Sequence, residues 1–538
     1  MSFRKYIITY IITGGVFSSA LMAQTFTDPS WLRMDDVKLT EGWLNAENAA
    51  GLVRFDGRQI SNAFLYVSGE SGDMRNCNDA KKFGEFGVKA RSYYRLSKNV
   101  VLNGEISYRN FTGKEMCNSY FIDPGHAPFD LIEYTTANAG EKNLEEYHVK
   151  GGVGAWLGKR WAIGASLDYT SANYSKRKDL RHINSLMNMV VGAGVLFAPT
   201  ESLSFGVNYT YHRRNESLLL SVYGKTDKVY YSLLSYGAFF GKQEVFGENG
   251  YTCENETKPL FDEYHGGALQ MEWKIAPQLR FFNEVSYRIR SGYYGDHSPS
   301  TIVYENHDGD RIAYKGFLVY EKETDTHTLQ IDVARNKVSA LENIYRYHQE
   351  SGGLNYIEYL GASEVGERTE LSAELLYTGR YAINKGMPVW QTQMGVSYHS
   401  RKTLAVNYPD YRRQDIGGWH AGIKGERNIL CDRNCYSIGL GIGYGSGSGK
   451  VAKDGKYSST NESSTLTRTL DDLLMQEYEF MTAPQTDVSV SFRYARQMEK
   501  ISARIYAVLD YQWKKAFDTA YLGNAQRHTA LLRIGCDF

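Results

Sequence analysis

Short stretches of this chain alternate between apolar and polar residues, and that period of two restricts the possible folds more than any other feature. In residues 100–110, Leu102 and Ile106 point to one side of an extended backbone while Glu105 and Arg109 point to the other. The same alternation recurs at residues 86–96, 203–212, 279–290, 390–399, 419–426, 436–444, 487–494, 501–511 and 528–538. Alternation over about ten residues predicts β-strands with one apolar face and one hydrated face.

The overall composition excludes several classes of protein. Charged residues make up 23% of the 538 residues, and the mean hydropathy is −0.45, whereas each span of a polytopic helical membrane protein needs about 20 mostly apolar residues. Disorder is disfavoured because 42% of the residues are hydrophobic and 14% are aromatic. The 61 basic residues only balance the 61 acidic ones, which argues against a nucleic-acid-binding protein. A soluble β-rich protein or a membrane β-barrel remains.

The connections between the predicted strands decide between these two folds, because they are alternately short and long. The short ones fall near residues 97–99, 158–159, 198–202, 276–278, 335–337, 380–388, 428–434 and 497–499, and the long ones near 112–144, 171–185, 213–262, 291–322, 349–367, 401–416, 446–485 and 514–525. Outer-membrane barrels have short periplasmic turns and long extracellular loops. With a first strand near residues 57–69, we therefore predict an all-β fold, a transmembrane antiparallel β-barrel of about 18 strands (16–20) over residues 57–538.

The N-terminus carries the features of an export signal. Arg4 and Lys5 precede an apolar stretch over residues 6–21, and the small residue Ala23 follows it. This order predicts a signal peptide over residues 1–23, cleaved near Ala23, rather than a buried helix. Residues 24–56 then precede the first strand, and their helix-compatible composition leaves two alternatives open: they plug the lumen, or they cap its periplasmic mouth.

The C-terminus is also typical of exported barrels. The last alternating stretch ends at Phe538, and it resembles the closing strand that the barrel-assembly machinery recognises. Together with Gln24 directly after the predicted cleavage site, this makes the chain resemble the uncharacterised outer-membrane β-barrel proteins of Bacteroidota. The resemblance implies the outer membrane of a Gram-negative bacterium, with membrane lipid and the assembly machinery as partners. Such barrels are often associated with nutrient uptake, so it also implies a neighbouring active-transport receptor as a partner.

The hydrated faces of the strands carry charges of both signs. Arg280, Glu284 and Arg288 recur every fourth residue on one strand, so all three point into the lumen. The candidate lumen residues are Arg91, Arg95, Glu105, Arg109, Arg280, Glu284, Arg288, Glu370 and Glu374. Two interpretations stay open: a constriction that selects polar solutes, or charge pairs that fill and stiffen the interior.

The chain has six cysteines, and the oxidising compartment of an exported protein favours disulfides. Cys77 and Cys117 fall in successive predicted external loops, while Cys431 and Cys435 fall in one short turn. These four cysteines are therefore candidates for disulfides, with Cys77–Cys117 and Cys431–Cys435 as the pairs that their positions allow. Metal binding by the second pair is the poorer interpretation, because no histidine or further cysteine pair stands nearby in the sequence.

The search for catalytic, metal and cofactor motifs yields no candidate. The glycine-rich stretch 439–450 does not complete a phosphate-binding loop, since Val451 stands where Ser or Thr is needed. We therefore predict that the chain is not an enzyme and is a channel or an accessory component for solute uptake, with recognition by the external loops. Two alternatives remain: a surface interaction protein with a sealed lumen, and an outer-membrane hydrolase, which residue spacing alone does not exclude.

Overall fold

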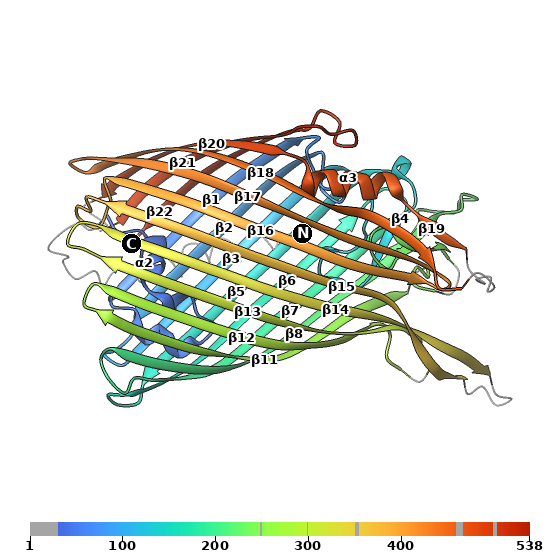
Figure 1. Ribbon diagram of the computed structural model, residues 1–538, viewed down its shortest axis with the longest axis horizontal. Helices are drawn as coiled ribbons and strands as arrows, with labels where there is room; N and C mark the ends of the chain where they lie inside the picture. The colour runs from blue at the N-terminus through green and yellow to red at the C-terminus, as the bar shows by residue number, and fades with distance from the viewer. Residues whose placement is uncertain are drawn as a thin grey trace, which may run out of the picture.

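The computed structural model describes residues 31–247, 250–254, 256–298, 300–349, 355–458, 466–498 and 503–538. Within them, eighteen strands form one closed antiparallel sheet in which each strand pairs with the next along the barrel and the last pairs with the first (Figure 1). The prediction of an antiparallel barrel of about 18 strands is therefore confirmed. The predicted signal peptide, its cleavage site near Ala23, and Gln24 lie outside the described residues.

The barrel strands have the following bounds: β1 (Gln59–Gly72), β2 (Lys82–Arg95), β3 (Val100–Met116), β5 (Gly140–Trp156), β6 (Trp161–Lys176), β7 (Arg181–Phe197), β8 (Leu203–Ser221), β11 (Thr257–Ala276), β12 (Leu279–Gly295), β13 (Val303–Glu321), β14 (Thr326–Gln349), β15 (Asn355–Tyr381), β16 (Trp390–Asn407), β17 (Asp410–Cys431), β18 (Asn434–Lys456), β20 (Gln485–Met498), β21 (Ala503–Ala516) and β22 (Gln526–Asp537). A second, four-stranded sheet is built from the connections, with β4 (Asp130–Glu133), β9 (Tyr231–Ser235), β10 (Phe240–Val245) and β19 (Thr467–Thr469). The helices are α2 (Met34–Thr40), α3 (Asp471–Thr482) and the short 3₁₀ turns η2 (Gly42–Asn45), η3 (Ala49–Arg54) and η4 (Thr136–Asn138).

The outward rows of the strands are apolar and exposed, as a lipid-facing surface requires. On β18, Ile438, Leu440 and Ile442 are 48%, 62% and 57% exposed, so they do not pack against a second sheet. Tryptophans such as Trp161 and Trp390, each 50% exposed, stand at the ends of these rows, where aromatic girdles meet the membrane interface. Among the described residues, no helix has the length and apolarity needed to span a membrane.

The C-terminal residue seals the junction between the last strand and the first. The Phe538 N–H donates to the Ser61 carbonyl (3.0 Å), and the Ser61 N–H donates to the Phe538 carbonyl (2.7 Å). From the neighbouring pair Asn62 and Asp537, β1 and β22 stay in register as far as the pair Gly72 and Arg527. The closed sheet therefore leaves no unpaired edge along the seam.

Two predicted connections are wrong, but the two errors cancel in the strand count. The turn expected at residues 335–337 lies inside β14, and the loop expected at 291–322 consists mostly of β13, so the actual turn is at 322–325. The strand count is unchanged because one strand was misplaced rather than missed. The loops expected at 171–185, 349–367 and 401–416 are short, because their flanking strands continue past the apolar band, where alternation no longer marks them.

The two ends of the barrel differ in what fills them. Figure 1 shows α2 and the C-terminus at one end and α3, β4 and β19 at the other. The first end carries the short turns, which we call the periplasmic end, and the second carries the long connections, which we call the extracellular end.

Candidate functional site

The N-terminal segment, residues 31–56, folds against the inner face of the barrel wall at the periplasmic end. Its first residue is anchored at a periplasmic turn, because the Trp31 N–H donates to the Lys385 carbonyl (2.7 Å). In α2, Asp36 accepts a hydrogen bond from the Arg33 N–H (3.1 Å), and acidic residues in a first turn suit the helix dipole. Trp43 is 1% exposed, stands edge-on to the Phe282 ring of β12 at 5.1 Å, and donates its Nε1–H to Glu272 Oε2 (3.0 Å).

Glycines on the inner face of the wall allow the segment to approach the backbone of the strands closely. A Cβ at Gly164 of β6 would lie 2.1 Å from the Ala50 nitrogen, and one at Gly154 of β5 would lie 2.9 Å from the Ala49 carbonyl oxygen. A Cβ at Gly194 of β7 would likewise meet Asn48 Oδ1 at 2.2 Å. Only residues without a side chain allow η3 to lie this close to three adjacent strands.

Ion pairs join acidic residues of the segment to arginines of the wall. Asp35 pairs with Arg91 (2.7 Å), Glu41 with Arg280 (2.5 Å) and Glu47 with Arg288 (2.6 Å). Asp36 likewise pairs with Arg380 (3.4 Å), and one pair of opposite polarity joins Arg33 of the segment to Glu426 of the wall (2.7 Å). Burial raises the pKa of Asp35, but the hydrogen bond and charge of Arg91 outweigh burial, and the pKa of Asp35 is lowered. Charges spread along the segment therefore bind it to strands on several sides of the lumen.

Four of the nine candidate lumen residues contact this segment. They are Arg91, Arg280 and Arg288, through the ion pairs above, and Glu284, whose Oε2 accepts the Glu47 N–H (2.9 Å). Sequence reasoning did not identify these partners, which lie up to 241 residues away along the chain. The glycines of residues 151–154 and 192–194 were the available signal, because small residues on a hydrated strand face mark a close approach.

The other five candidates pair within the wall or lie apart from the segment. Arg109 bonds Glu146 on the neighbouring strand (2.8 Å), and Glu105 pairs with Lys89. Arg95 lies at a periplasmic turn, where its side chain donates to the Gly57 carbonyl (3.3 Å). Glu370 stands 3.5 Å from Arg368, and Glu374 lines a cavity described next. The structure thus does not gather the nine residues into one ring.

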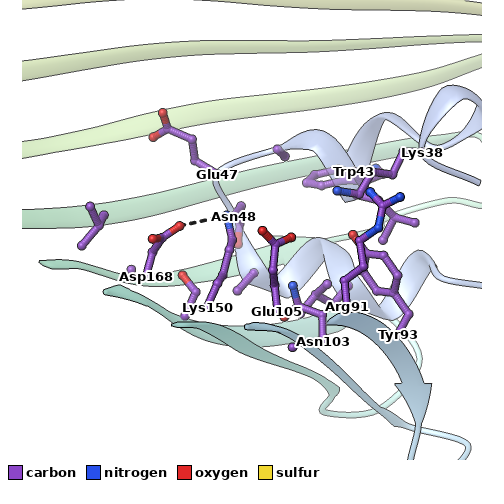
Figure 2. A pocket seen from close by; sticks show the side chains of 18 of the residues that line it. Lys38, Trp43, Glu47, Asn48, Arg91, Tyr93, Asn103, Glu105, Lys150 and Asp168 are labelled. Atoms are coloured by element: carbon purple, nitrogen blue, oxygen red, sulfur yellow. Dashed lines mark ion pairs between the residues drawn. The ribbon is translucent and has the colours of Figure 1, made fainter. Parts of the chain in front are cut away.

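Two cavities of about 310 and 320 Å³ lie inside the lumen, and both are lined by Glu47. The first lies between the N-terminal segment and the wall strands that carry Arg91, Glu105, Lys150 and Asp168 (Figure 2). Lys150 and Asp168 form an ion pair there (3.3 Å). The second is bounded by β12 to β16 and lined by Glu284, Arg311, Lys315, Asp332, Glu374 and His399, among others. We call the two cavities the chamber, which is hydrophilic and carries both signs of charge.

The extracellular end is closed by the four-stranded sheet, which we call the lid. On one face Leu131, Leu234 and Phe240 pack with wall residues into one cluster, and the first two are fully buried. The wall contributes Leu218, Leu220, Leu260, Tyr294, Tyr304, Ala340, Val365 and Ala405 to this cluster. On its other face Ile132 and Leu233 pack against Leu474 of α3. The lid is therefore buried on both faces, like the sheet of a small globular domain.

The connection between β3 and β4, residues 117–129, lies next to the lid and is held to the inner face of the wall by hydrogen bonds. The Ile122 N–H donates to Glu216 Oε1 (2.7 Å), and Arg290 Nη1 donates to the His126 carbonyl (3.0 Å). The His126 ring lies 3.1 Å from Asp262 Oδ2. Burial, with Arg290 and Arg214 nearby, lowers the pKa of His126 to about 3. The neutral imidazole therefore holds this contact at physiological pH.

Neither candidate disulfide is present, since all six cysteines have free thiols. Cys431 and Cys435 cannot face each other, because Cys435 pairs with Leu430 and the neighbouring Cys431 points to the opposite side of the sheet. Cys435 is accordingly 1% exposed while Cys431 is exposed. Cys77 and Cys117 are both buried, and each thiol donates to the side-chain oxygen of an adjacent asparagine, at 3.2 and 3.3 Å.

Comparison with known proteins gives a family. Residues 49–538 match the model of a family of unknown function (DUF6850). No match to a curated protein was found. Among solved structures, the chain is similar to BauA, the ferric preacinetobactin receptor from Acinetobacter baumannii, at 9% identity over 90% of this chain and 80% of that chain, with a TM-score of 0.39.

Two further solved structures show the same degree of similarity. The outer-membrane transporter YddB from Escherichia coli has 6% identity over 88% of this chain and 81% of that chain, with a TM-score of 0.38. A mutant of the monoaromatic hydrocarbon channel TodX has 10% identity over 96% of this chain and 97% of that chain, with a TM-score of 0.31. At such identities the likeness concerns the fold alone.

Proposed function

The chain belongs to this family of unknown function, and we propose that it is an outer-membrane uptake barrel with a gated passage. In this proposal the N-terminal segment plugs the periplasmic end, the lid closes the extracellular end, and a polar solute crosses only when both move. The resting protein is then not an open diffusion pore. Phe538 serves as the assembly signal, and a neighbouring active-transport receptor is the expected partner of a barrel that is opened from outside itself.

The observation that supports this proposal is the hydrophilic chamber between two separate closures. Eighteen strands enclose more space than their side chains fill, and a barrel with a purely structural role needs neither this width nor a charged interior. Glu47 and Arg288 at the chamber are 28% and 20% exposed, so water reaches the ion pairs that hold the segment. Ion pairs in contact with water exchange partners at low cost, which suits a plug that is released and rebound.

Conductance in planar bilayers tests the proposal. We expect little steady conductance from the wild-type protein, little from a variant lacking residues 31–56, and little from a variant in which residues 118–133 and 231–245 are each replaced by a short linker. Combining both changes should give a large conductance, because each closure alone blocks the passage. Heat-dependent migration on gels verifies that the barrel of each variant is folded. A large conductance from wild type, or none from the folded double variant, refutes the proposal.

A second candidate function is binding at the cell surface. Strands β14 and β15 are 24 and 27 residues long and project beyond the other connections (Figure 1). Tyr347, Tyr356 and Tyr359 near their tip are 51%, 42% and 46% exposed, and exposed tyrosines are typical of recognition surfaces. Replacing Tyr347 and Tyr356 with serine should then reduce retention on a panel of immobilised surface polysaccharides. Unchanged retention would exclude this role for the hairpin.

A further inference from the structure

The outer face of β16, β17 and β18 carries a graded series of side chains along the membrane normal. The rows follow from strand pairing, and from the middle of the membrane outward they are Met394–Ile423–Ile442, Val396–Ala421–Tyr444, Tyr398–Trp419–Ser446, Ser400–Gly417–Ser448, Lys402–Asp415–Lys450 and Leu404–Arg413–Lys453. The series passes from apolar through aromatic and small polar residues to cationic ones. The surface of a membrane lipid changes in the same order from acyl chain to head group.

An apolar groove of about 690 Å³ occupies the first rows of this series and extends over β15 and β14, where Leu375 and Leu329 line it. It lies where the small side chain of Ala421 stands between Val396 and Tyr444, with Met394 and Ile442 beside it. Val396 and Ile442 are 51% and 57% exposed. Because these residues belong to the lipid-facing band, the molecule that fills the groove in the membrane is an acyl chain.

A polar depression of about 550 Å³ lies next to the groove on the extracellular side, on β16, β17 and β18. Its floor is made by Ser400, Gly417 and Ser448, and Lys402 and Lys450 stand at its outer edge. A Cβ at Gly417 would lie 3.1 Å from the Tyr398 hydroxyl and 3.4 Å from the Ser400 Cβ, so glycine keeps the floor low. The depression is thus open to solvent, lined by hydroxyl groups and rimmed by cations.

The charge of the rim favours an anion. Lys402, Lys450, Arg413 and Lys453 contribute four positive charges, while Asp415 contributes one negative charge and pairs with Lys402 at 3.6 Å. Lys402 and Lys450 flank β17 and therefore stand about 10 Å apart, so both can reach one phosphorylated head group. Lys402 is 68% exposed and pays little to exchange its carboxylate partner for a phosphate.

The depth of the rim matches the head-group level. From Trp390 at the periplasmic girdle, β16 runs about 26 Å along the strand to Tyr398 and about 40 Å to Lys402. At a strand tilt of about 40° these lengths are about 20 and 30 Å along the membrane normal, so Lys402 lies just beyond the roughly 25 Å apolar band of such barrels. Ser400 and Lys402 are the next outward residues. They therefore stand where the phosphates of outer-leaflet lipids lie.

We propose that the outer face of β16–β18 binds an outer-leaflet lipid with a phosphate-bearing head group. One acyl chain lies in the groove beside Ala421, and the phosphate lies between Lys402 and Lys450. The site is independent of the lumen and of the proposed passage. It would fix the barrel in its lipid surroundings on the side opposite the segment-bearing strands β5–β7.

Native mass spectrometry of the purified full-length barrel tests this site. The probes are phosphatidylglycerol and phosphatidylcholine with the same acyl chains, together with soluble glycerol phosphate as a competitor. The variants are Lys402→Glu/Lys450→Glu and Ala421→Trp. The matched control is Lys82→Glu/Lys114→Glu, a pair of exposed lysines that face each other on β2 and β3. Heat-dependent migration checks that every variant is folded.

We expect the wild type to retain phosphatidylglycerol in preference to phosphatidylcholine. The double lysine variant should lose at least about tenfold in phosphatidylglycerol retention, because one lysine near an anionic lipid surface contributes roughly fivefold. Ala421→Trp should reduce retention of both lipids, and the control should match wild type. Unchanged phosphatidylglycerol retention in either test variant overturns the proposal. Displacement by glycerol phosphate as effectively as by lipid also overturns it, since the site would then bind free phosphate.

Discussion

Substituting Gly164 with alanine tests whether the N-terminal segment rests directly on the barrel wall. The new Cβ would lie 2.1 Å from the Ala50 nitrogen and 2.3 Å from the Ala49 carbonyl carbon, at least about 1 Å closer than ordinary van der Waals contact. Both contacts are to backbone, so η3 must lift away as a unit. Overpacking of this kind costs about 1–3 kcal/mol, which corresponds to about a fivefold to 150-fold larger population of the displaced segment.

Hydrogen exchange measured by mass spectrometry detects that displacement. Amides of residues 49–54 should exchange faster in Gly164→Ala by about the same factor, while amides of the barrel strands keep their protection. Gly395→Ala is the matched control, because it adds a Cβ whose nearest neighbour would lie 3.5 Å away, at ordinary contact distance. If the folded Gly164→Ala protein protects residues 49–54 as well as wild type does, η3 does not pack against Gly164.

Four further predictions follow from particular contacts. Burial raises the pKa of Asp130 in β4 to about 7 from an ordinary 3.8. Protonated Asp130 therefore stabilises the lid below about pH 4, and this contribution is lost as the pH rises through about 7. Asp130→Asn should flatten the pH dependence of lid protection in hydrogen exchange, and an unchanged slope contradicts the assignment. A double-mutant cycle on Glu47 and Arg288, paired at 2.6 Å, should give a coupling free energy of about 1 kcal/mol for segment protection, and zero coupling would show that the pair is incidental. Deleting Phe538 should lower the amount of barrel assembled in cell membranes without preventing refolding in detergent, and equal loss in both would indicate a purely structural role. A maleimide reagent should label exposed Cys431 in the folded protein and buried Cys435 only after unfolding, whereas resistance of both thiols in the unfolded, unreduced protein would indicate a disulfide.

Alternation in the sequence predicts the barrel because lipid imposes it. Every outward position between Trp390 and Tyr398 meets hydrocarbon, and every inward one meets water or polar side chains, so the period is clear. Beyond the girdles both faces are polar. In β13, Asp308 and Asp310 lie on the same outward face as Ile312, and the composition of this stretch is typical of a loop. The ends of the strands could not be predicted because water lies on both faces of the sheet beyond the girdles, and alternation appears only where the two faces meet different surroundings.

The lumen contacts could not be predicted for a different reason. The spacing of Arg280, Glu284 and Arg288 places them on one strand face, but nothing local to them indicates Glu41 and Glu47 as partners. An arginine in a lumen has the same sequence environment whether it binds a solute, a neighbouring strand or a plug. The lid is a similar case, since Leu131, Leu234 and Tyr294 come from three connections or strands that only the closed sheet brings together.

The order of the chain has a consequence for how this molecule matures. Residues 31–33 are synthesised early, yet their contacts Glu426 and Arg504 belong to the final quarter of the polypeptide. The earliest part of the protein must therefore wait for the latest part before it reaches its final position. Its first described residue lies at the Lys385 turn and its last leads into β1 at the same end of the barrel, so the segment reaches its place without threading. In the gated passage that we propose, it would withdraw and return while staying attached to the wall.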